Sequence, residues 1–359
     1  MPPILLERGN MYNNLKIKNF KKFENFEVNL SPITIIGGEN NSGKSTILDA
    51  IFLNCDYLDS SVFLKLINLR TREYAQPLSE YNIWLPLFNG LSLNNPFIIE
   101  LGDRTLRIEI NSNNPDIIIS DAQNNNIIKE LSFEFTENNK DIKYTGSYKL
   151  EKKYNHLDQS QSSLNRIINE ELLKPLEFIK VVYIGPNTFM SDNYTAELFS
   201  KIELGGKKQE LINFLKVIDT SIENITTIII SGRVSLYVYK NNINIPLYSV
   251  GDGIKKLLHV ALCLIIDPVK ILLLDEIENG IHYSAMSKFW EALSTLAKEY
   301  ECQIIATTHS YELLQNAKEG IENSGRREDL KFIRIEENKA VSFDPENLDF
   351  FFEKGWELR

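Results

Sequence analysis

A glycine-containing loop between a short apolar run and a helical pattern places the strongest constraint on this chain. Residues 33–36 read ITII, an apolar run typical of a β-strand, and residues 46–52 begin a pattern typical of an α-helix. The segment GENNSGKST, residues 38–46, joins the two. A strand, a glycine loop ending in Gly-Lys-Ser and a helix, in this order, form a P-loop, which holds the phosphates of a nucleotide. The sequence therefore predicts a nucleotide-binding α/β domain.

The residues of this loop have distinct expected roles. Gly38 and Gly43 let the backbone turn so that successive N–H groups face a phosphate, and the helix beginning near Ser45 adds its positive end. Lys44 would reach the β- and γ-phosphates of ATP, while Ser45 would place its hydroxyl on Mg²⁺. The nucleotide-binding residues expected here are Gly38, Asn40, Asn41, Ser42, Gly43, Lys44, Ser45 and Thr46.

Two carboxylates follow a second apolar run. Residues 269–276 read VKILLLDE, and such a continuous run is typical of a parallel strand buried on both faces. Ligands of open α/β sheets bind at the carboxyl ends of such strands. We therefore expect Asp275 to bind Mg²⁺ together with Ser45. We expect Glu276 to orient and deprotonate the attacking water.

A histidine follows the next predicted strand. Residues 303–307 read QIIAT and precede Thr308-His309-Ser310. A neutral His309 could hydrogen-bond a γ-phosphate oxygen or position Glu276, although a single histidine in such a place is often structural. Its position after the carboxylate strand favours the catalytic role. For His282 a functional role and a structural role are both open.

A second candidate anion-binding end precedes the carboxylate strand. Residues 249–253 read SVGDG and lead into an amphipathic helical pattern over residues 254–266. Ser249 and Gly251 would stand at the N-terminus of this helix, where backbone N–H groups attract anions. Alone, this segment would be an ordinary capped helix.

The composition narrows the class of protein. The 359 residues are 43% hydrophobic and 25% charged, which is typical of soluble globular proteins. A net charge of −10 argues against a surface that coats nucleic acid, although a local basic groove stays open. The scattered Cys55, Cys263 and Cys302 are expected as buried thiols in a reducing compartment. No apolar run approaches the roughly 18 residues of a membrane helix, so we expect a cytoplasmic protein without a membrane partner.

The rest of the chain is expected to complete one domain over residues 11–359, with residues 1–10 as an N-terminal appendage. A β-rich and helical subdomain is expected as an insertion over residues 80–178. Predicted strands are a hairpin within 15–30, short runs over 80–150, and segments at 179–184, 227–231, 234–239, 243–247 and 330–335. Predicted helices cover residues 56–75, 160–178, 195–224, 284–299 and 347–356. Gln76, after the P-loop helix, is a candidate for a metal-sensing glutamine, although no flanking pattern supports it.

These motifs together resemble the ABC-type ATPase head shared by SMC, RecF and overcoming-lysogenization-defect (OLD) proteins. The resemblance rests on residues 15–30, GENNSGKST, SVGDG, LLLDEIENGIH over 272–282 and ATTHS over 306–310. DEIENGIHYS and ATTHS shift the resemblance toward the OLD-like ATPases of bacterial defence systems. SVGDG differs from the LSGGQ of transporters, so a transporter head is not expected.

The resemblance implies a fold and a partner. The fold is an α/β P-loop NTPase of the ABC-head type with an antiparallel β-subdomain. Two heads would enclose two ATP molecules, with Ser249 and Gly251 of one chain contacting the γ-phosphate held by the P-loop of the other. About 50 residues follow His309, too few for the Toprim nuclease domain that OLD nucleases carry. We therefore expect a dimeric ATP-driven switch, in anti-phage defence, acting on a separately encoded nuclease or toxin.

Two other functions are compatible with the sequence. The first is a RecF- or SMC-like repair ATPase that binds DNA, for which steeply salt-sensitive DNA affinity would be diagnostic. Its phosphate contacts would come from Lys16, Lys18, Lys21, Lys22, Lys201, Lys207 and Lys208. The second is a nucleotide-gated scaffold without catalysis. The set of Lys44, Asp275 and Glu276 weighs against it, and a phosphate-release assay decides the matter.

Overall fold

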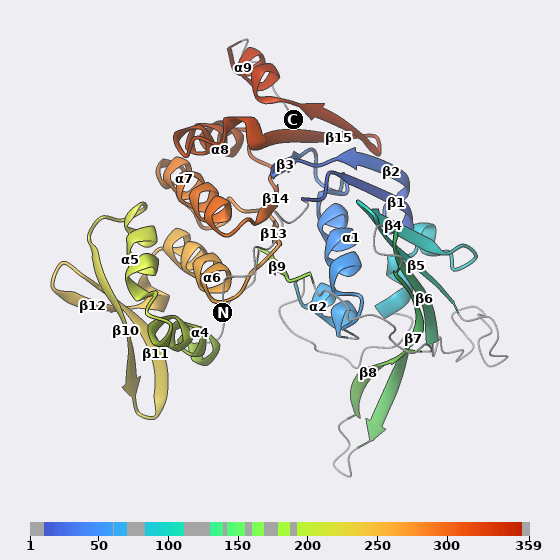
Figure 1. Cartoon of the computed structure of the whole chain (residues 1–359), viewed down its shortest axis with the longest axis horizontal. Helices are drawn as coiled ribbons and strands as arrows, with labels where there is room; N and C mark the ends of the chain where they lie inside the picture. Colours follow the sequence, from blue (N-terminus) through green and yellow to red (C-terminus); the bar gives the residue numbers. More distant parts are fainter. Residues whose placement is uncertain are drawn as a thin grey trace, which may run out of the picture.

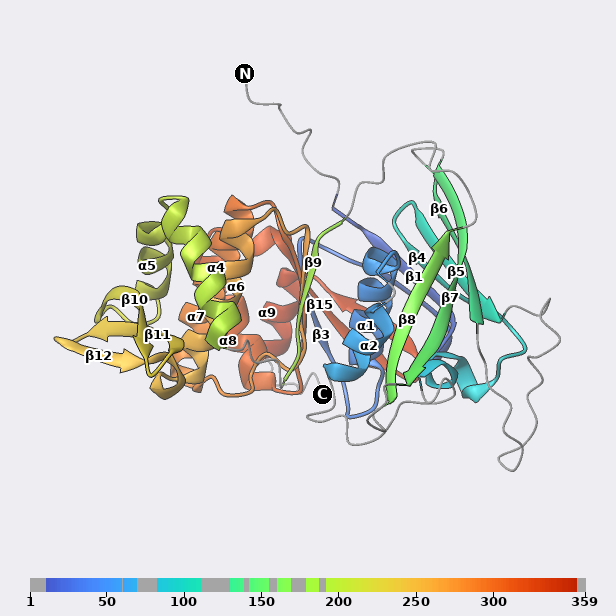
Figure 2. The ribbon, with the colours of Figure 1, turned by 90° about the horizontal axis from the view of Figure 1, so that it is seen from below.

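A computed structural model of the chain shows an α/β protein in which helices lie between and beside β-sheets (Figures 1 and 2). The structure describes residues 11–59, 61–69, 83–110, 130–138, 142–154, 160–168, 179–186 and 192–353. Residues 1–10, Gln76 and His156 therefore lie outside the described part.

A largely parallel sheet forms the centre of the molecule. Its strand order is β16-β15-β3-β14-β13-β9, and only β16 runs antiparallel to its neighbour. The strands are β3 (Ile33–Gly37), β9 (Val181–Ile184), β13 (Ile271–Leu274), β14 (Gln303–Thr307), β15 (Leu330–Glu336) and β16 (Lys339–Phe343). Because β14 lies between β3 and β13, the ends of the P-loop strand and the carboxylate strand are one strand apart.

The apolar runs of this sheet are continuous because both faces are covered. Leu272 and Leu274 of β13 belong to the core on one face, whereas Ile271 and Leu273 belong to the core on the other. Successive side chains of a strand point to opposite faces, so each core takes every second residue.

One face of the central sheet packs on α1 (Lys44–Asp56), which lies between it and a second, antiparallel sheet (Figure 2). The strand order of that second sheet is β2-β1-β4-β5-β6-β7-β8. Its strands are β1 (Asn14–Phe20), β2 (Phe23–Asn29), β4 (Phe97–Leu101), β5 (Arg104–Ile110), β6 (Glu130–Glu137), β7 (Ile142–Tyr154) and β8 (Ser160–Ile168). The helix α2 (Val62–Asn68) follows α1. Since β4 pairs with β1, the strands of the expected insertion extend the sheet begun by the N-terminal hairpin.

The other face packs on α6 (Asp252–Ile266), α7 (Tyr283–Glu299) and α8 (Tyr311–Asn323). Beyond these helices lie α4 (Asp192–Leu204), α5 (Lys208–Lys216) and a three-stranded antiparallel sheet (Figure 2). Its strands are β10 (Ile222–Ile230), β11 (Arg233–Lys240) and β12 (Ile243–Pro246). The last helix of the described part is α9 (Pro345–Glu353).

Most predicted elements are confirmed, but two helices are not. The helix predicted over residues 160–178 is wrong over Ser160–Ile168, which is β8 and pairs with β7. Several serines lower the helix propensity of this segment, and pairing with a long neighbouring strand outweighs its apolar spacing. The helix predicted to reach residue 224 ends at Lys216, and the β-branched residues that follow lead into β10.

Two expectations drawn from composition can be compared with this structure. Within the described ranges, no helix combines the length and the apolar character needed to cross a bilayer. Cys55 and Cys302 are buried as expected, while Cys263 is half-buried. Burial raises the pKa of each thiol, to about 12 for Cys55 and Cys302 and to about 11 for Cys263, so all three are poor nucleophiles.

Candidate nucleotide site

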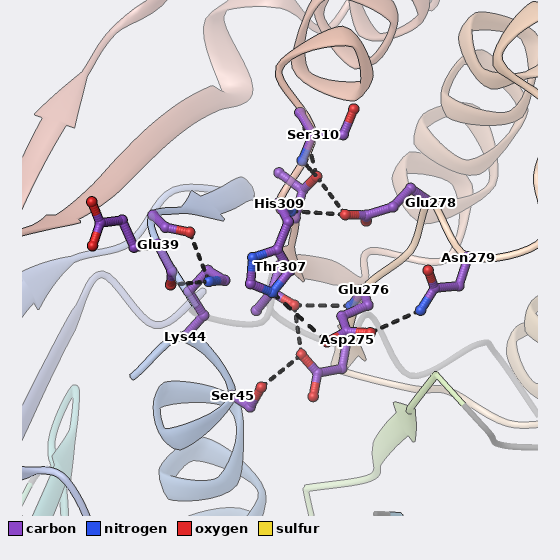
Figure 3. Close-up of polar contacts among 12 residues, drawn as sticks. Glu39, Lys44, Ser45, Asp275, Glu276, Glu278, Asn279, Thr307, His309 and Ser310 are labelled. Atoms are coloured by element: carbon purple, nitrogen blue, oxygen red, sulfur yellow. Dashed lines mark hydrogen bonds and ion pairs between the residues drawn. The ribbon is translucent and has the colours of Figure 1, made fainter. Parts of the chain in front are cut away.

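The P-loop connects β3 to α1 at the carboxyl edge of the central sheet (Figure 3). Gly43 precedes the first residue of α1 with φ of 109°, a left-handed conformation that glycine tolerates. A Cβ atom at Gly43 would also lie 2.4 Å from the ring of Phe23 in β2. Backbone conformation and packing against the hairpin therefore both require glycine here.

The other expected phosphate-binding residues lie along the same loop and the first turn of α1. Asn40 and Asn41 are exposed, and the carbonyl oxygen of Asn41 accepts a hydrogen bond from Lys22 Nζ. Ser42 Oγ is buried and bonds to no residue in the part of the chain that the structure describes. A buried hydroxyl of this kind on a glycine loop fits a phosphate oxygen as its partner. Thr46 is half-buried in the first turn of α1.

Lys44 lies inside the loop. Its side-chain nitrogen donates hydrogen bonds to the carbonyl oxygens of Gly38 at 2.8 Å and Glu39 at 2.7 Å. Burial lowers the pKa of Lys44 from 10.5 to about 8, and the nearby carboxylates of Asp275 and Glu276 only partly oppose that shift. The loop thus holds a cation whose charge is poorly solvated, and an arriving phosphate would stabilise that charge.

The expected magnesium residues meet across 230 positions of sequence. Ser45 Oγ donates a hydrogen bond to Asp275 Oδ1 at 3.0 Å. Thr307, at the end of the intervening β14, donates to the same oxygen at 2.5 Å and accepts the backbone N–H of Glu276 at 2.9 Å. A single threonine therefore links the strand end that carries Asp275 to the backbone of the predicted base.

A tyrosine holds the other oxygen of Asp275. The Tyr183 hydroxyl, from β9, lies 3.2 Å from Asp275 Oδ2 and 3.3 Å from Asp49 Oδ1. Asp49 lies on α1 with no solvent exposure, and Lys21 of the β1–β2 turn forms an ion pair with it at 2.5 Å. Asp275 is thereby anchored to the core helix and the N-terminal hairpin.

Glu276 and His309 face each other beside Asp275 (Figure 3). Their closest atoms, Oε1 of Glu276 and Nε2 of His309, are 3.7 Å apart. Glu276 has φ of 49°, a strained value for a residue with a side chain, and strain of this kind is concentrated at functional sites. Asn279 Nδ2 donates to Glu276 Oε2 at 2.8 Å and fixes the carboxylate from the side opposite His309.

Sequence reasoning missed four residues that support the site: Tyr183, Asn279, Thr307 and Glu278. Tyr183 and Thr307 stand at or near the carboxyl ends of strands beside β13, and that position was their available signal. Asn279 and Glu278 follow Glu276 closely, but which atoms they would bond depends on how the loop folds.

Ser249 and Gly251 lie on the surface next to the N-terminus of α6. Both are exposed at the start of α6, and no hydrogen bond of the described residues joins them to the loop. The start of α6 contacts instead the loop after Glu276. A Cβ atom at Gly280 would lie 2.8 Å from Asp252, and Lys256 Nζ donates to the carbonyl oxygen of Ile277 at 3.1 Å.

The remaining described histidines have structural surroundings. His282 is the N-cap of α7: its Nδ1 accepts the backbone N–H of Ser284, and its ring packs against Tyr283. His259 is packed within α6, where burial lowers its pKa to about 4 and keeps it neutral.

A cavity of about 320 Å³ opens beside the P-loop. One wall is residues 37–40 and the other is residues 308–311, with Leu314 and Phe332 adding apolar surface. His309 therefore lies between this cavity and Glu276, so a molecule bound beside the loop would be within its reach.

The donor set of this site fits ATP and Mg²⁺. Mg²⁺ prefers oxygen ligands and is commonly bound by one or two carboxylates together with phosphates. Ser45 and Asp275 supply a hydroxyl and a carboxylate oxygen side by side. Among the described residues no group of three or more His, Cys, Asp or Glu side chains gathers as a metal cluster. At a site of this kind, phosphate oxygens and water molecules supply the other ligands of Mg²⁺.

Comparisons with known proteins agree with this geometry. The family model described as "AAA domain, putative AbiEii toxin, Type IV TA system" matches residues 33–315. The "ATP/GTP phosphatase" of Helicobacter pylori (strain ATCC 700392 / 26695) is 26% identical over 370 residues, covering 96% of this chain and 98% of the relative.

Solved structures of SMC heads are also similar to the chain. The SmcHead bound to the C-winged helix domain of ScpA has a TM-score of 0.49 at 15% identity, covering 94% of this chain and all of that one. The SMC head domain from Thermotoga maritima has a TM-score of 0.41 at 14% identity, with 93% of this chain and 99% of that chain covered.

The family match, over residues 33–315, spans the P-loop, the carboxylate strand and His309. This chain is therefore a P-loop ATPase that belongs to the AAA domain family described as a putative AbiEii toxin of type IV toxin–antitoxin systems.

Proposed function

We propose that the protein is a dimeric switch that closes when it binds Mg-ATP and opens when Glu276 and His309 promote hydrolysis. The observation that carries this proposal is the hydrogen bond of 3.0 Å between Ser45 and Asp275, with Glu276 and His309 beside it. A P-loop serine, a carboxylate placed to bind a metal and a base then lie side by side, as phosphoryl transfer to water requires.

Each residue of this site has a role in the proposed reaction. Lys44 and the backbone N–H groups of the loop bind the phosphates, and Ser45 and Asp275 hold Mg²⁺. The metal, when bound, neutralises charge on the phosphate oxygens. Glu276 orients the attacking water and accepts its proton, and His309 holds Glu276 or a γ-phosphate oxygen in place.

The dimer is supported by the exposure of the second candidate phosphate-binding segment. Ser249 and Gly251 precede α6 on the surface, beside Tyr248, which is 72% exposed. In the proposed closed state they contact the γ-phosphate held by the partner's P-loop. ATP then stabilises the closed state through contacts that ADP cannot make, which is the differential affinity that a switch requires.

The family description supports a setting in defence. It names a toxin of toxin–antitoxin systems, and the motifs of this chain resemble those of OLD-like defence ATPases. Within that setting, the resemblance to OLD-like ATPases implies the proposed role, which is to license or restrain a separately encoded nuclease or toxin in anti-phage defence.

The lysines proposed for DNA binding give little support to the repair function. Four of them bind carboxylates: Lys16 with Glu27, Lys21 with Asp49, Lys201 with Glu197 and Lys208 with Glu203. A lysine that is already paired gains less from a phosphate, so the switch is the better-supported function.

The proposal is tested with Lys44→Ala and Glu276→Gln. Lys44→Ala removes the phosphate cation, so binding of a fluorescent ATP analogue should be lost. Glu276→Gln keeps the shape of the side chain without its basicity. It should bind ATP, lose hydrolysis by about 100-fold or more and accumulate as an ATP-bound dimer in size-exclusion chromatography with light scattering. Full hydrolysis by Glu276→Gln would remove the assigned base.

A further inference from the structure

Glu278 joins the loop that carries Glu276 to the loop that carries His309 (Figure 3). Its Oε1 accepts the backbone N–H of His309 at 2.7 Å and the hydroxyl of Thr308 at 3.1 Å. Thr308 Oγ1 in turn accepts the backbone N–H of Ser310 at 2.9 Å. The three residues after β14 are thus tied to one carboxylate oxygen.

These contacts differ from those of a solvated surface charge. Glu278 Oε2 is buried, and within the described ranges it accepts no hydrogen bond. Burying a carboxylate oxygen is costly, so its Oε1 bonds must offset that cost. The charge also lies close to the N-terminus of α8, which begins at Tyr311, and the helix dipole stabilises it there.

The loop that bears Glu278 is itself held in place. Thr307 bonds the backbone N–H of Glu276 at the start of the loop, and Lys256 bonds the carbonyl oxygen of Ile277 in its middle. The predicted base and the group that holds His309 are therefore two residues apart on one fixed segment.

We propose that Glu278 is a positioning residue that holds the backbone of His309 so that its imidazole faces Glu276. The proposal rests on the ATPase function proposed above and adds a residue to it. Glu278 does not touch the reacting atoms: it acts through His309, whose Nε2 lies 3.7 Å from Glu276 Oε1.

The test compares Glu278→Ala with Glu278→Gln. Glu278→Ala removes both hydrogen bonds and should lower kcat for ATP hydrolysis by about tenfold or more, because small misplacements of catalytic groups are costly. The affinity for ATP and the KM should change by less than about twofold, since the hydrogen bonds of the Glu278 side chain go to Thr308 and His309 and, among the described residues, none goes to the P-loop. Glu278→Gln keeps a carbonyl oxygen acceptor and should retain most of kcat.

Glu312→Ala is the matched control. Glu312 is an exposed carboxylate in the first turn of α8 and makes no side-chain contact with His309 among the described residues. If Glu278 served only the helix dipole, Glu312→Ala would lower kcat as much as Glu278→Ala. Such a result would overturn the proposal, as would unchanged kcat in Glu278→Ala. Should Glu278→Ala fail to fold, Glu278→Asp replaces it, because it keeps the charge but withdraws the acceptor.

A double-mutant cycle with His309→Ala gives the decisive comparison. If Glu278 acts through His309, adding Glu278→Ala to His309→Ala should cause no further loss of kcat. Independent, multiplying losses would show a different role. Failure of the proposed function is recognised separately. In that case the wild-type protein would hydrolyse no ATP, or Glu276→Gln would hydrolyse ATP as fast as the wild-type protein.

Discussion

At the scale of single residues, the site is a set of groups held in unfavourable surroundings by their neighbours. Lys44 is a cation at 4% exposure, Glu276 has a strained backbone, and Ser42 keeps a buried hydroxyl. Each would cost stability elsewhere in a protein, and in the proposed reaction each would act on a phosphate or a water molecule. The effect of a bound phosphate should therefore be most direct at Lys44, which carries a buried charge.

Nucleotide affinity should fall as pH rises above the pKa of Lys44. That pKa is about 8 in the free chain, and bound phosphates would move it back toward 10.5. The complex then holds more protons than the free protein in this range, so the association constant should fall by up to about tenfold per pH unit. Titrating a fluorescent ATP analogue between about pH 7 and about pH 9.5 measures the slope.

Lys44→Arg is the control for this titration. An arginine stays protonated throughout the range, so whatever affinity the variant retains should not depend on pH in this way. An affinity of the wild-type protein that stays constant above pH 8 would mean that Lys44 keeps its proton in the free chain.

Site residues that belong to short sequence motifs can be predicted from the sequence. Residues that join the site only through tertiary contacts cannot. Lys44, Ser45, Asp275 and Glu276 belong to two short motifs, each with a strand before it, so their meeting follows from parallel strands sharing one edge. Tyr183, by contrast, matters because β9 happens to lie beside β13. No pattern within either segment specifies that neighbour.

At the scale of elements, the hydrophobic pattern predicts a strand correctly where both of its faces are buried. It fails where pairing with a neighbouring strand determines the secondary structure. The strands β3, β13 and β14 are short, continuous apolar runs, and their assignment follows directly. The segment that forms β8 has apolar residues at spacings that suit a helix, yet it pairs along β7. That pairing involves residues outside the segment, so a local pattern cannot reveal it.

The packing of α8 on α7 predicts a stability effect at Gly320. A Cβ atom there would lie 2.1 Å from the backbone carbonyl oxygen of Ser287 and 2.9 Å from Glu291 N, so the two helix backbones approach closely. Gly320→Ala should therefore lower the free energy of unfolding by about 1–3 kcal/mol, despite the better helix propensity of alanine. Urea unfolding measures the change.

The neighbouring Glu319 provides the control, because its side chain is exposed on the same helix. Glu319→Ala should change the free energy of unfolding by no more than about 0.5 kcal/mol. Equal stability of Gly320→Ala and the wild-type protein would show that the helices can separate without cost.

At the scale of the whole molecule, the pocket and the exposed start of α6 lie on one chain but are proposed to act on different ATP molecules. Within a chain the two are connected, since Asp252 contacts Gly280 and Lys256 bonds Ile277 in the loop after Glu276. In the proposed dimer, a shift of α6 on contact with the partner's γ-phosphate would thus be transmitted to the loop after Glu276 in the same chain. Whether the sites are shared in this way is a property of the dimer that mixing experiments resolve.

Mixing Lys44→Ala with Ser249→Arg should restore ATP hydrolysis that neither variant has alone. The first lacks a working P-loop but keeps Ser249, while the second has an intact P-loop and an arginine that blocks the exposed start of α6. In a mixed dimer the intact P-loop of one chain faces the intact Ser249 of the other, so one complete site forms.

Mixing Lys44→Ala with Glu276→Gln is the control. Both changes lie on the P-loop side of the same site, so each site of the mixed dimer keeps one defect and no activity should return. Recovery is measured as phosphate release against the mixing ratio. No recovery in the first mixture, with both proteins folded, would show that each chain completes its own site.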